Sequence, residues 1–345
     1  DRRFTYEEAQ EIIETGKGDF QEEVLQLDKL AKILRENRFK AGAINFDRYE
    51  VKFEIDEKGK PVSVYFKESK DANKLIEEFM LLANRTVAEK IGRVPKGKKA
   101  KVLPYRIHDL PDPEKLDNLA QFIARFGYKL RTSGTKTDIS KSINHLLDDI
   151  QGKKEENLIE TVSIRAMQKA RYSVHNVGHY GLAFDYYTHF TSPIRRYPDL
   201  AIHRIMTAQL KGMDKDTMVL RYSDFAEKAS KQSSEREIIA MQIERKAEDC
   251  YKAEYARRHL GECYEGRISG VTQRGLFIEL DNGVEGFVPA SSLTPSGTML
   301  TEGIRLSDPV SGKNWSLGDT MMITIVRADV NLGKIDFEVA PASTK

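Results

Sequence analysis

Apolar residues recur every three or four positions through long stretches of the first 255 or so residues. One such stripe runs from Val24 to Leu34 and a second from Ile76 to Ile91. This spacing places the apolar side chains on one face of a helix, so two amphipathic helices are predicted. Gly92 follows the second stripe directly, where a glycine commonly caps a helix.

Helix start signals occur at two further places. Asp112 precedes a proline, which predicts an N-cap and a first-turn proline, and Gly127 would end that helix. Ser234 and Glu237 match a capping box, which predicts the start of a long charged helix that reaches about His259. The first part of the chain is therefore expected to be mainly helical.

Short alternating runs interrupt the helical pattern. Tyr49–Ile55 and Val62–Phe66 alternate in the manner of strands, and Asp56–Gly59 between them has turn composition. A β-hairpin is predicted here. Together with the helices it makes residues 1–258 an α+β domain.

The pattern changes after Gly261, where short alternating runs replace the long helices. Asp281–Gly283 has the composition of a hairpin turn. Short strands with such turns favour a small all-β barrel of the OB-fold class, which we place at residues 259–345. The strands are predicted at Tyr264–Val271, Leu276–Leu280, Gly286–Val288, Met321–Val326 and Lys334–Val339.

Composition indicates a folded protein and leaves its partner open. The 345 residues are enough for two domains. Hydrophobic residues make up 40% and charged residues 31%, which excludes the disordered and fibrous classes. Lys plus Arg total 55 against 53 for Asp plus Glu, so the net charge of +2 argues neither for nor against nucleic acid.

Cys250 and Cys263 are the only cysteines, and neither has a neighbour at zinc-finger spacing. A disulfide framework is excluded and a reducing compartment is expected. The sequence has neither a run of about 18 apolar residues nor a signal peptide. We therefore expect a cytoplasmic protein without a membrane partner.

Candidate chemistry is concentrated in residues 178–199, G-H-Y-G-L-A-F-D-Y-Y-T-H-F-T-S-P-I-R-R-Y-P-D. Prolines lie on both sides of Arg195 and Arg196 and restrict the backbone there. A guanidinium held in this way suits bidentate contact with a phosphate, and the nearby aromatic residues offer faces for unstacked bases. The alternative is an ordinary ion pair between one of these arginines and Asp199 or Asp185.

Three strings of this chain have a familiar form. The string T-S-P-I-R-R-Y-P-D-L-A-I-H-R, preceded by G-H-Y-G-L-A and Y-T-H-F, closely resembles the signature of the RNB family of exoribonucleases. That family includes ribonuclease R and ribonuclease II, and its bacterial ribonuclease R members resemble the chain most. Residues 40–47 and 75–84 agree as well, and residues 261–280 resemble an S-one RNA-binding domain. The resemblance covers nearly the whole chain.

The resemblance implies a processive 3′→5′ exoribonuclease that hydrolyses single-stranded RNA to nucleoside 5′-monophosphates. The family's catalytic arginine, which contacts the scissile phosphate, falls on Arg195. An aromatic residue that stacks on the last bases falls on Phe46, and the residues that favour ribose fall on Tyr6 and on Glu77 or Glu78. The open alternatives are a core role for Phe46 and helix charge pairing for Glu77.

Further RNA contacts are implied along the chain. Glu244 falls near a glutamate that touches the terminal bases, although in its highly charged helix it could equally face solvent. Tyr187 and Arg196 are expected beside the strand. Base stacking in the barrel should be weak, because its first turn has one aromatic residue and Pro289 stands at the family's histidine position. The barrel residues expected to contact RNA are Arg274, Phe277, Phe287 and Lys334.

One part of the family's active site has no counterpart in this sequence. The family binds Mg²⁺ through a tight cluster of aspartates, and two-metal chemistry needs several carboxylates that converge on ions about 3.5–4 Å apart. Asp148 and Asp149 are adjacent on a predicted helix, and Asp109 and Asp112 lie in a loop. In the family the cluster precedes the region matched here. We therefore expect no metal ligand in this chain, and a missing N-terminal part of the same polypeptide that holds Mg²⁺.

Two other functions remain open. One is a non-catalytic RNA-binding module of the same fold, which the presence of Arg195 disfavours. The other is an S-one adaptor associated with translation. An adaptor would explain the barrel and leave residues 1–258 without a role.

Overall fold

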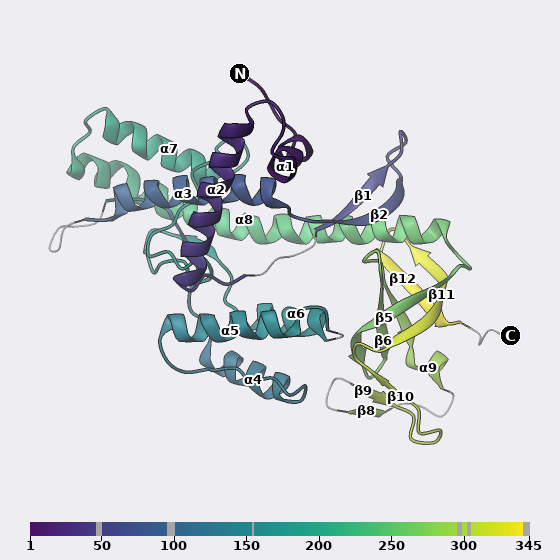
Figure 1. Ribbon diagram of the computed structural model, residues 1–345. Helices are drawn as coiled ribbons and strands as arrows, with labels where there is room; N and C mark the ends of the chain where they lie inside the picture. Colours follow the sequence, from purple (N-terminus) through teal and green to yellow (C-terminus); the bar gives the residue numbers. More distant parts are fainter. Residues whose placement is uncertain (46–49, 95–100, 154, 295–298, 302–304, 341–345) are drawn as a thin grey trace. The chain divides into compact units, whose positions relative to one another are not determined.

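The computed structural model describes residues 1–45, 50–94, 101–153, 155–294, 299–301 and 305–340 (Figure 1). Contacts divide the chain into two compact units. We call residues 1–47, 69–149 and 162–238 the helical unit, and residues 48–68, 150–161 and 239–345 the barrel unit. These units follow contacts rather than chain order, so the domain boundary that we place after residue 258 stays a prediction.

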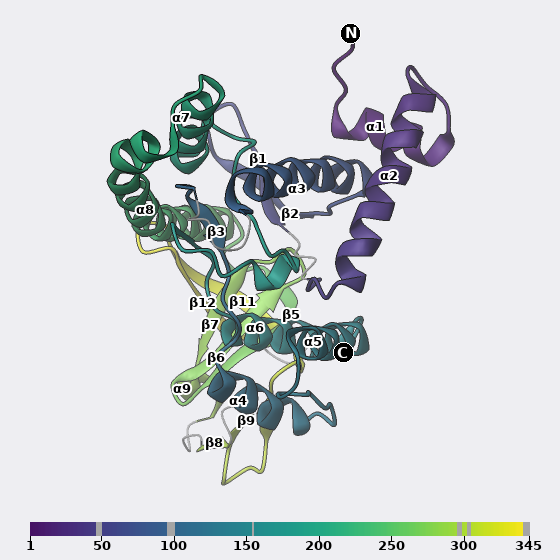
Figure 2. The ribbon, with the colours of Figure 1, turned by 90° about the vertical axis from the view of Figure 1, so that its left-hand side faces the viewer.

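Helices make up most of the helical unit. Its elements are α1 (Tyr6–Thr15), α2 (Gln21–Lys40), α3 (Asp71–Gly92), β3 (Tyr105–Ile107), α4 (Pro113–Ala124), α5 (Lys136–Ile150), β4 (Arg171–Ser173), the short 3-10 helix η1 (Tyr180–Leu182) and α7 (Tyr197–Leu210). Two helices, α6 (Glu156–Ala166) and α8 (Lys215–Arg258), are divided between the units, and the last residue of α5, Ile150, belongs to the barrel unit. Helices α1, α2 and α3 pack against one another (Figure 2). Strand β3 pairs with β4. Throughout the described residues, no helix combines the length and apolar character that a membrane span requires.

The predicted helices are present, and capping contacts define the ends of α4 and α1. At the start of α4 the Asp112 side chain accepts a hydrogen bond from Glu114 N at 2.9 Å, so the predicted N-cap is confirmed. At α1, Thr5 and Glu8 form a reciprocal capping box, and Gly16 ends the helix in the left-handed conformation.

The predicted helix does end at Gly92, but Gly92 is not its capping residue. Helix α3 includes Gly92 and is capped by Arg93 in an extended conformation. A glycine is needed at this position because a Cβ atom there would overlap the phenol of Tyr105. The glycine therefore permits close packing of β3 against α3 and does not supply a left-handed cap.

The helix start predicted at Ser234 is also wrong. Ser234 and Glu237 lie inside α8. The Ser234 hydroxyl donates to Ser230 O at 2.9 Å within the helix and accepts a hydrogen bond from Tyr172 N at 2.9 Å. The same four-residue pattern that marks a helix start thus serves here to attach β4 to the middle of a helix.

One buried cluster joins the elements that hold the candidate site. Ile91 of α3, Leu103, Ile107 of β3 and Ile202 of α7 are each at most 3% exposed and pack together. Burial of aliphatic side chains of this size contributes about 1.5–3 kcal/mol each to folding. The cluster therefore fixes α3 and α7 against β3.

The barrel unit contains the predicted five-stranded barrel. Its strands are β5 (Cys263–Thr272), β6 (Gly275–Leu280), β7 (Glu285–Pro289), β11 (Thr320–Asp329) and β12 (Lys334–Val339). They close in the order β11-β12-β7-β6-β5, and β12 runs parallel to β7. Alternate residues point inward, so Leu276, Ile278 and Phe337 are fully buried in the barrel. An α+β region followed by an OB-type barrel is therefore confirmed.

Smaller elements accompany the barrel. β1 (Glu50–Ile55) and β2 (Pro61–Lys67) form the predicted hairpin, which packs Val64 into the barrel's core cluster. A three-stranded sheet of β8 (Met299–Thr301), β9 (Arg305–Ser307) and β10 (Asn314–Ser316), and the short helix α9 (Ala290–Leu293), were not predicted. Elements of three or four residues are too short to show a hydrophobic period.

Candidate functional site

The two adjacent arginines lie on a turn that leads into α7. We call residues 191–196 the arginine turn. Its backbone closes through hydrogen bonds from the N–H groups of Arg195 and Arg196 to Ser192 O, at 3.3 and 3.0 Å. The Arg195 side chain is exposed, and among the described residues it has neither a hydrogen bond nor an ion pair. Arg195 is therefore free to meet a ligand.

Arg196 has the opposite role. Its Nη2 atom donates to Asp199 Oδ1 at 2.8 Å, and Asp199 is fully buried. The same carboxylate oxygen accepts a hydrogen bond from Ser192 N at 2.8 Å. The ion-pair alternative therefore holds for Arg196 and not for Arg195. Since its charge is engaged in holding the turn, the predicted contact of Arg196 with RNA finds no support in this structure.

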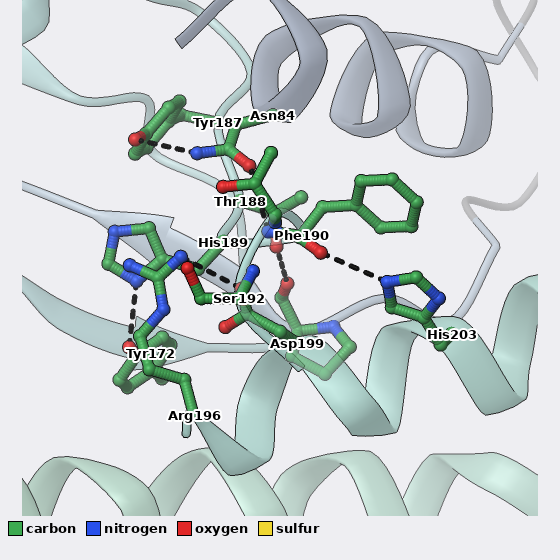
Figure 3. A network of polar contacts seen from close by, with 12 residues as sticks. Asn84, Tyr172, Tyr187, Thr188, His189, Phe190, Ser192, Arg196, Asp199 and His203 are labelled. Atoms are coloured by element: carbon green, nitrogen blue, oxygen red, sulfur yellow. Dashed lines mark hydrogen bonds and ion pairs between the residues drawn. The ribbon is translucent and has the colours of Figure 1, made fainter. Parts of the chain in front are cut away.

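A buried asparagine fastens the segment before the turn (Figure 3). Asn84 of α3 is 2% exposed, and its Oδ1 atom accepts hydrogen bonds from Phe190 N at 2.9 Å and Thr191 N at 3.2 Å. Its Nδ2 atom donates to the hydroxyl of Tyr187 at 3.2 Å. One side chain thus satisfies two backbone donors that burial would otherwise leave unpaired. Sequence reasoning missed Asn84, whose only signal is a polar residue within the apolar stripe of a helix.

Helix α7 holds the same segment from the other side. The His203 ring stacks on Phe190 with centroids 4.2 Å apart and an interplanar angle of 6°. Its Nε2 atom donates to Phe190 O at 3.0 Å. Together with Asp199 this anchors both ends of the arginine turn to α7 (Figure 3). Side chains of α3 and α7 therefore hold the turn in place, in addition to the two flanking prolines.

Two partly buried histidines near the turn are neutral. Burial, followed by the charge of Arg196, lowers the pKa of His189 to about 2. Burial, followed by His108, lowers the pKa of His179 to about 3. The His189 ring is hydrogen-bonded to the Tyr172 hydroxyl at 2.8 Å. These imidazoles therefore act as neutral packing groups, and the positive charge at the site comes from arginine.

Tyr187 is not available to stack on a base. It is 4% exposed, and its ring packs against His179 at 5.3 Å and Phe184 at 5.7 Å. From the sequence, Tyr187 is expected to lie beside the RNA strand. The structure instead buries its ring, and its hydroxyl accepts a hydrogen bond from Asn84 Nδ2.

The two glutamates proposed for ribose recognition differ sharply in exposure. Glu78 is 3% exposed and forms a buried ion pair with Arg38 of α2. The Glu77 side chain is 50% exposed, with Oε1 3.7 Å from Arg38 Nη2. Only Glu77 could reach a ligand without breaking a buried ion pair. Of the two glutamates, Glu77 is therefore the better candidate for a contact with ribose.

Three contacts predicted within residues 1–258 remain, and each falls on a different part of the chain. Tyr6 is the first residue of α1 and is 44% exposed. Phe46 lies outside the described residues. Glu244 is exposed on α8 in the barrel unit, where its charge raises the pKa of Lys52 in a minor way. The RNA contact of Glu244 and its alternative, a solvated face, both stay predictions.

The four residues predicted in the barrel meet at one pocket. It has a volume of about 670 Å³ and lies on the outer surface of β6, β7 and β12. Phe277 and Phe287 are cross-strand neighbours with ring centroids 5.1 Å apart. Arg274 and Lys334, both exposed, lie on its wall. Two cations beside an aromatic pair are what a single-stranded nucleic acid site requires.

The described residues do not fit a Mg²⁺ pair. Among them, no three His, Cys, Asp or Glu side chains come together as metal ligands. Asp149 contacts His145 at 2.8 Å, Asp109 contacts Arg171 at 3.0 Å, and Asp112 caps α4. Each of these carboxylates therefore has a local structural partner.

Family models match both parts of the chain. The RNB domain model matches residues 1–212, more than half of the 345 residues, and the S1 RNA binding domain model matches residues 259–340. The chain belongs to the RNB family. The expected resemblance is therefore confirmed, and the S1 match extends over the five-stranded barrel.

Curated relatives of this RNB chain are named Ribonuclease R. The protein of that name from Aquifex aeolicus is 36% identical over 346 residues, which cover 98% of this chain and 48% of the relative. Ribonuclease R 1 of Lactococcus lactis is 38% identical over 317 residues, covering 91% of this chain and 38% of the relative. The chain thus spans about half or less of the length of these relatives.

Solved structures share the RNB fold of this chain. Mycoplasma genitalium RNase R in complex with ribose-methylated single-stranded RNA superposes with a TM-score of 0.84 at 23% identity, covering 98% of this chain and 53% of that one. Yeast Ssd1, described as a pseudonuclease, has a TM-score of 0.55 at 18% identity and covers 94% of this chain and 38% of that one. At these identities the likeness concerns the fold alone.

Proposed function

We propose that this chain supplies the phosphate-binding arginine and part of the RNA-binding surface of a processive 3′→5′ exoribonuclease. Its substrate is single-stranded RNA and its products are nucleoside 5′-monophosphates. The observation that carries the proposal is Arg195, an exposed guanidinium without a partner among the described residues on a turn held by buried contacts. Membership of the RNB family and relatives named Ribonuclease R support it.

The arginine turn is suited to act on a phosphodiester. A planar guanidinium donates two parallel hydrogen bonds to phosphate oxygens. Because Asp199 and Asn84 already hold the turn, little reorganisation is needed when negative charge develops on the phosphorus centre. The N-terminus of α7 begins two residues later and adds a favourable potential for an anion. Arg195 is therefore assigned to the transition state and Arg196 to the support of the turn.

The metal of the reaction is proposed to be Mg²⁺ held outside the described residues. Among the described residues, the carboxylates do not form a site for it. The part of the RNB domain that completes this chain in its relatives would carry the ligands. Single-stranded RNA and that part of the polypeptide are the proposed partners.

The test uses the polypeptide that combines this chain with the metal-binding part. Arg195→Ala should lower kcat by about 10²–10³-fold and change KM by only a few-fold, because the guanidinium acts mainly on the transition state. Arg236→Ala is the matched control, since Arg236 is an exposed arginine on α8 in the helical unit, outside the signature string, and should leave both constants near the wild-type values. A loss of affinity with unchanged turnover at saturation would make Arg195 a binding residue only.

A second candidate function is a non-catalytic RNA-binding module. The observation in its favour is the fold shared with yeast Ssd1, which is described as a pseudonuclease. This alternative predicts RNA binding without release of mononucleotides from the same combined polypeptide. It also predicts that Arg195→Ala changes only the dissociation constant.

A further inference from the structure

The barrel pocket carries a feature that phosphate binding does not explain. On the outer face of β6 and β7, the Phe277–Phe287 pair is followed by a second cross-strand pair, Glu279 and Glu285. Both glutamates line the pocket together with the two phenylalanines. Carboxylates directly opposite each other on a sheet repel, and both repel an RNA phosphate. The part of the pocket beside these two glutamates therefore suits a ligand group that donates hydrogen bonds and does not suit a phosphate.

The two carboxylates differ in their contacts. Glu285 Oε2 accepts a hydrogen bond from the Ser269 hydroxyl at 2.7 Å. Glu279 is partly buried, and within the described part of the chain its carboxylate has no hydrogen bond. A partly desolvated carboxylate without a donor is unfavourable until a ligand supplies one. Glu279 is therefore an acceptor that faces the pocket without a protein donor.

The charges around Glu279 are mixed. Burial first and Glu285 second raise its pKa, whereas Lys252 of α8 and Arg267 of β5 lower it. Burial makes the ionised carboxylate poorly solvated, and this increases the gain from a hydrogen-bond donor on a ligand. The two cations oppose this rise in the pKa and lie where they favour the ionised carboxylate.

We propose that this pocket binds a nucleobase stacked on Phe277 or Phe287 and uses Glu279 to favour a base with an exocyclic amino group. This inference rests on the proposed RNA-binding function of the barrel and adds a base preference to it. Cytosine presents an N4 amino donor where uracil presents an O4 carbonyl, and carboxylates accept from cytosine N4 in nucleic acid complexes. Uracil would instead place an acceptor against an acceptor. Cytosine is therefore preferred over uracil.

The test compares oligo(C) with oligo(U) of equal length, since both bases are pyrimidines of similar stacking area. Fluorescence anisotropy with the whole 345-residue chain should give about tenfold tighter binding of oligo(C). Glu279→Gln should bring the ratio close to one, because an amide both donates and accepts, and should tighten binding of oligo(U). Glu338→Gln is the control, since Glu338 is exposed on β12 and does not line the pocket.

The outcomes separate two failures. If the chain binds both oligomers equally and Glu279→Gln changes nothing, the base preference is refuted while RNA binding by the chain stands. If Phe277→Ala leaves both affinities unchanged, the barrel pocket does not bind RNA, and this inference fails together with that part of the proposed function. Fluorescence of Trp315 in β10 reports whether each variant's barrel remains folded. Should Glu279→Gln fail that check, Glu285→Gln removes the neighbouring charge, and an unchanged oligo(U) affinity would refute the proposal.

Discussion

Replacing Glu78 by alanine should destabilise the helical unit far more than the same change at its neighbour Glu77. The side chains of Arg38 and Glu78 are 5% and 3% exposed, and Arg38 Nε also lies 3.4 Å from Glu78 Oε2. Removing the carboxylate leaves the guanidinium buried beside a second arginine, since Arg35 Nη1 is 4.0 Å from the same glutamate. Removing one partner of a buried ion pair costs about 3–5 kcal/mol.

The matched control is Glu77→Ala. The Glu77 side chain is 50% exposed, and its distance of 3.7 Å to Arg38 makes it a surface partner at most. Exposed ion pairs contribute about 0–1 kcal/mol. For a folded unit of this size, the Glu78 variant should therefore lose about 10 °C in melting temperature and the Glu77 variant less than about 3 °C.

Two spectroscopic signals separate the units. Circular dichroism at 222 nm follows the helices, whereas the single tryptophan, Trp315, lies in the barrel unit and follows the barrel. Glu78→Ala should shift the first signal and leave the midpoint of the second nearly unchanged. Equal small shifts for both glutamate variants would refute the conclusion that the Arg38–Glu78 pair holds α2 against α3.

Three further outcomes follow from buried contacts. His179 and His189 stay neutral in the folded protein, whereas in the unfolded chain they take up protons below a pKa of about 6.5, so the free energy of unfolding should fall below that pH by up to about 1.4 kcal/mol per pH unit for each histidine. Thermal melts from pH 7.5 to 4.5 should show this slope, and His189→Asn should reduce it. Gly92→Ala should destabilise by about 1–3 kcal/mol in urea titrations, because the new Cβ meets Tyr105, although alanine normally favours a helix. Asn84→Ala should lower the free energy of unfolding by about 1–3 kcal/mol and lower turnover of the combined polypeptide, because Phe190 N and Thr191 N lose their acceptor. Asn84→Asp keeps an acceptor oxygen and should retain more of the stability and of the turnover. Equal behaviour of the two variants would contradict the role given to Asn84 Oδ1.

Periodic features were predicted well because they depend on local spacing. The apolar stripe that ends at Ile91 and the alternating runs that begin at Tyr264 correspond to α3 and to the barrel strands. The errors arise where a distant residue decides. Gly92 is set by Tyr105, and Ser234 by Tyr172, and neither contact leaves a trace in the neighbouring sequence.

The candidate site shows the same limit. Adjacent arginines look alike in sequence, but a buried carboxylate engages Arg196 and leaves Arg195 exposed. Tyr187 is an aromatic residue of the kind that stacks on bases. It is nevertheless buried, and its hydroxyl is hydrogen-bonded to Asn84, which lies more than a hundred positions away in the sequence. Residue types and their order thus indicated the kind of chemistry, and the packing decided which side chain can perform it.

Release of nucleoside 5′-monophosphates from an RNA with a single-stranded 3′ end tests the central claim. The 345-residue chain is assayed with Mg²⁺, alone and together with the proposed metal-binding part of the polypeptide. We expect no release by the chain alone, release by the combination, and strong loss when the combination carries Arg195→Ala. Sustained release by the rigorously purified chain alone would contradict the account, because the metal ligands would then lie within residues 1–345.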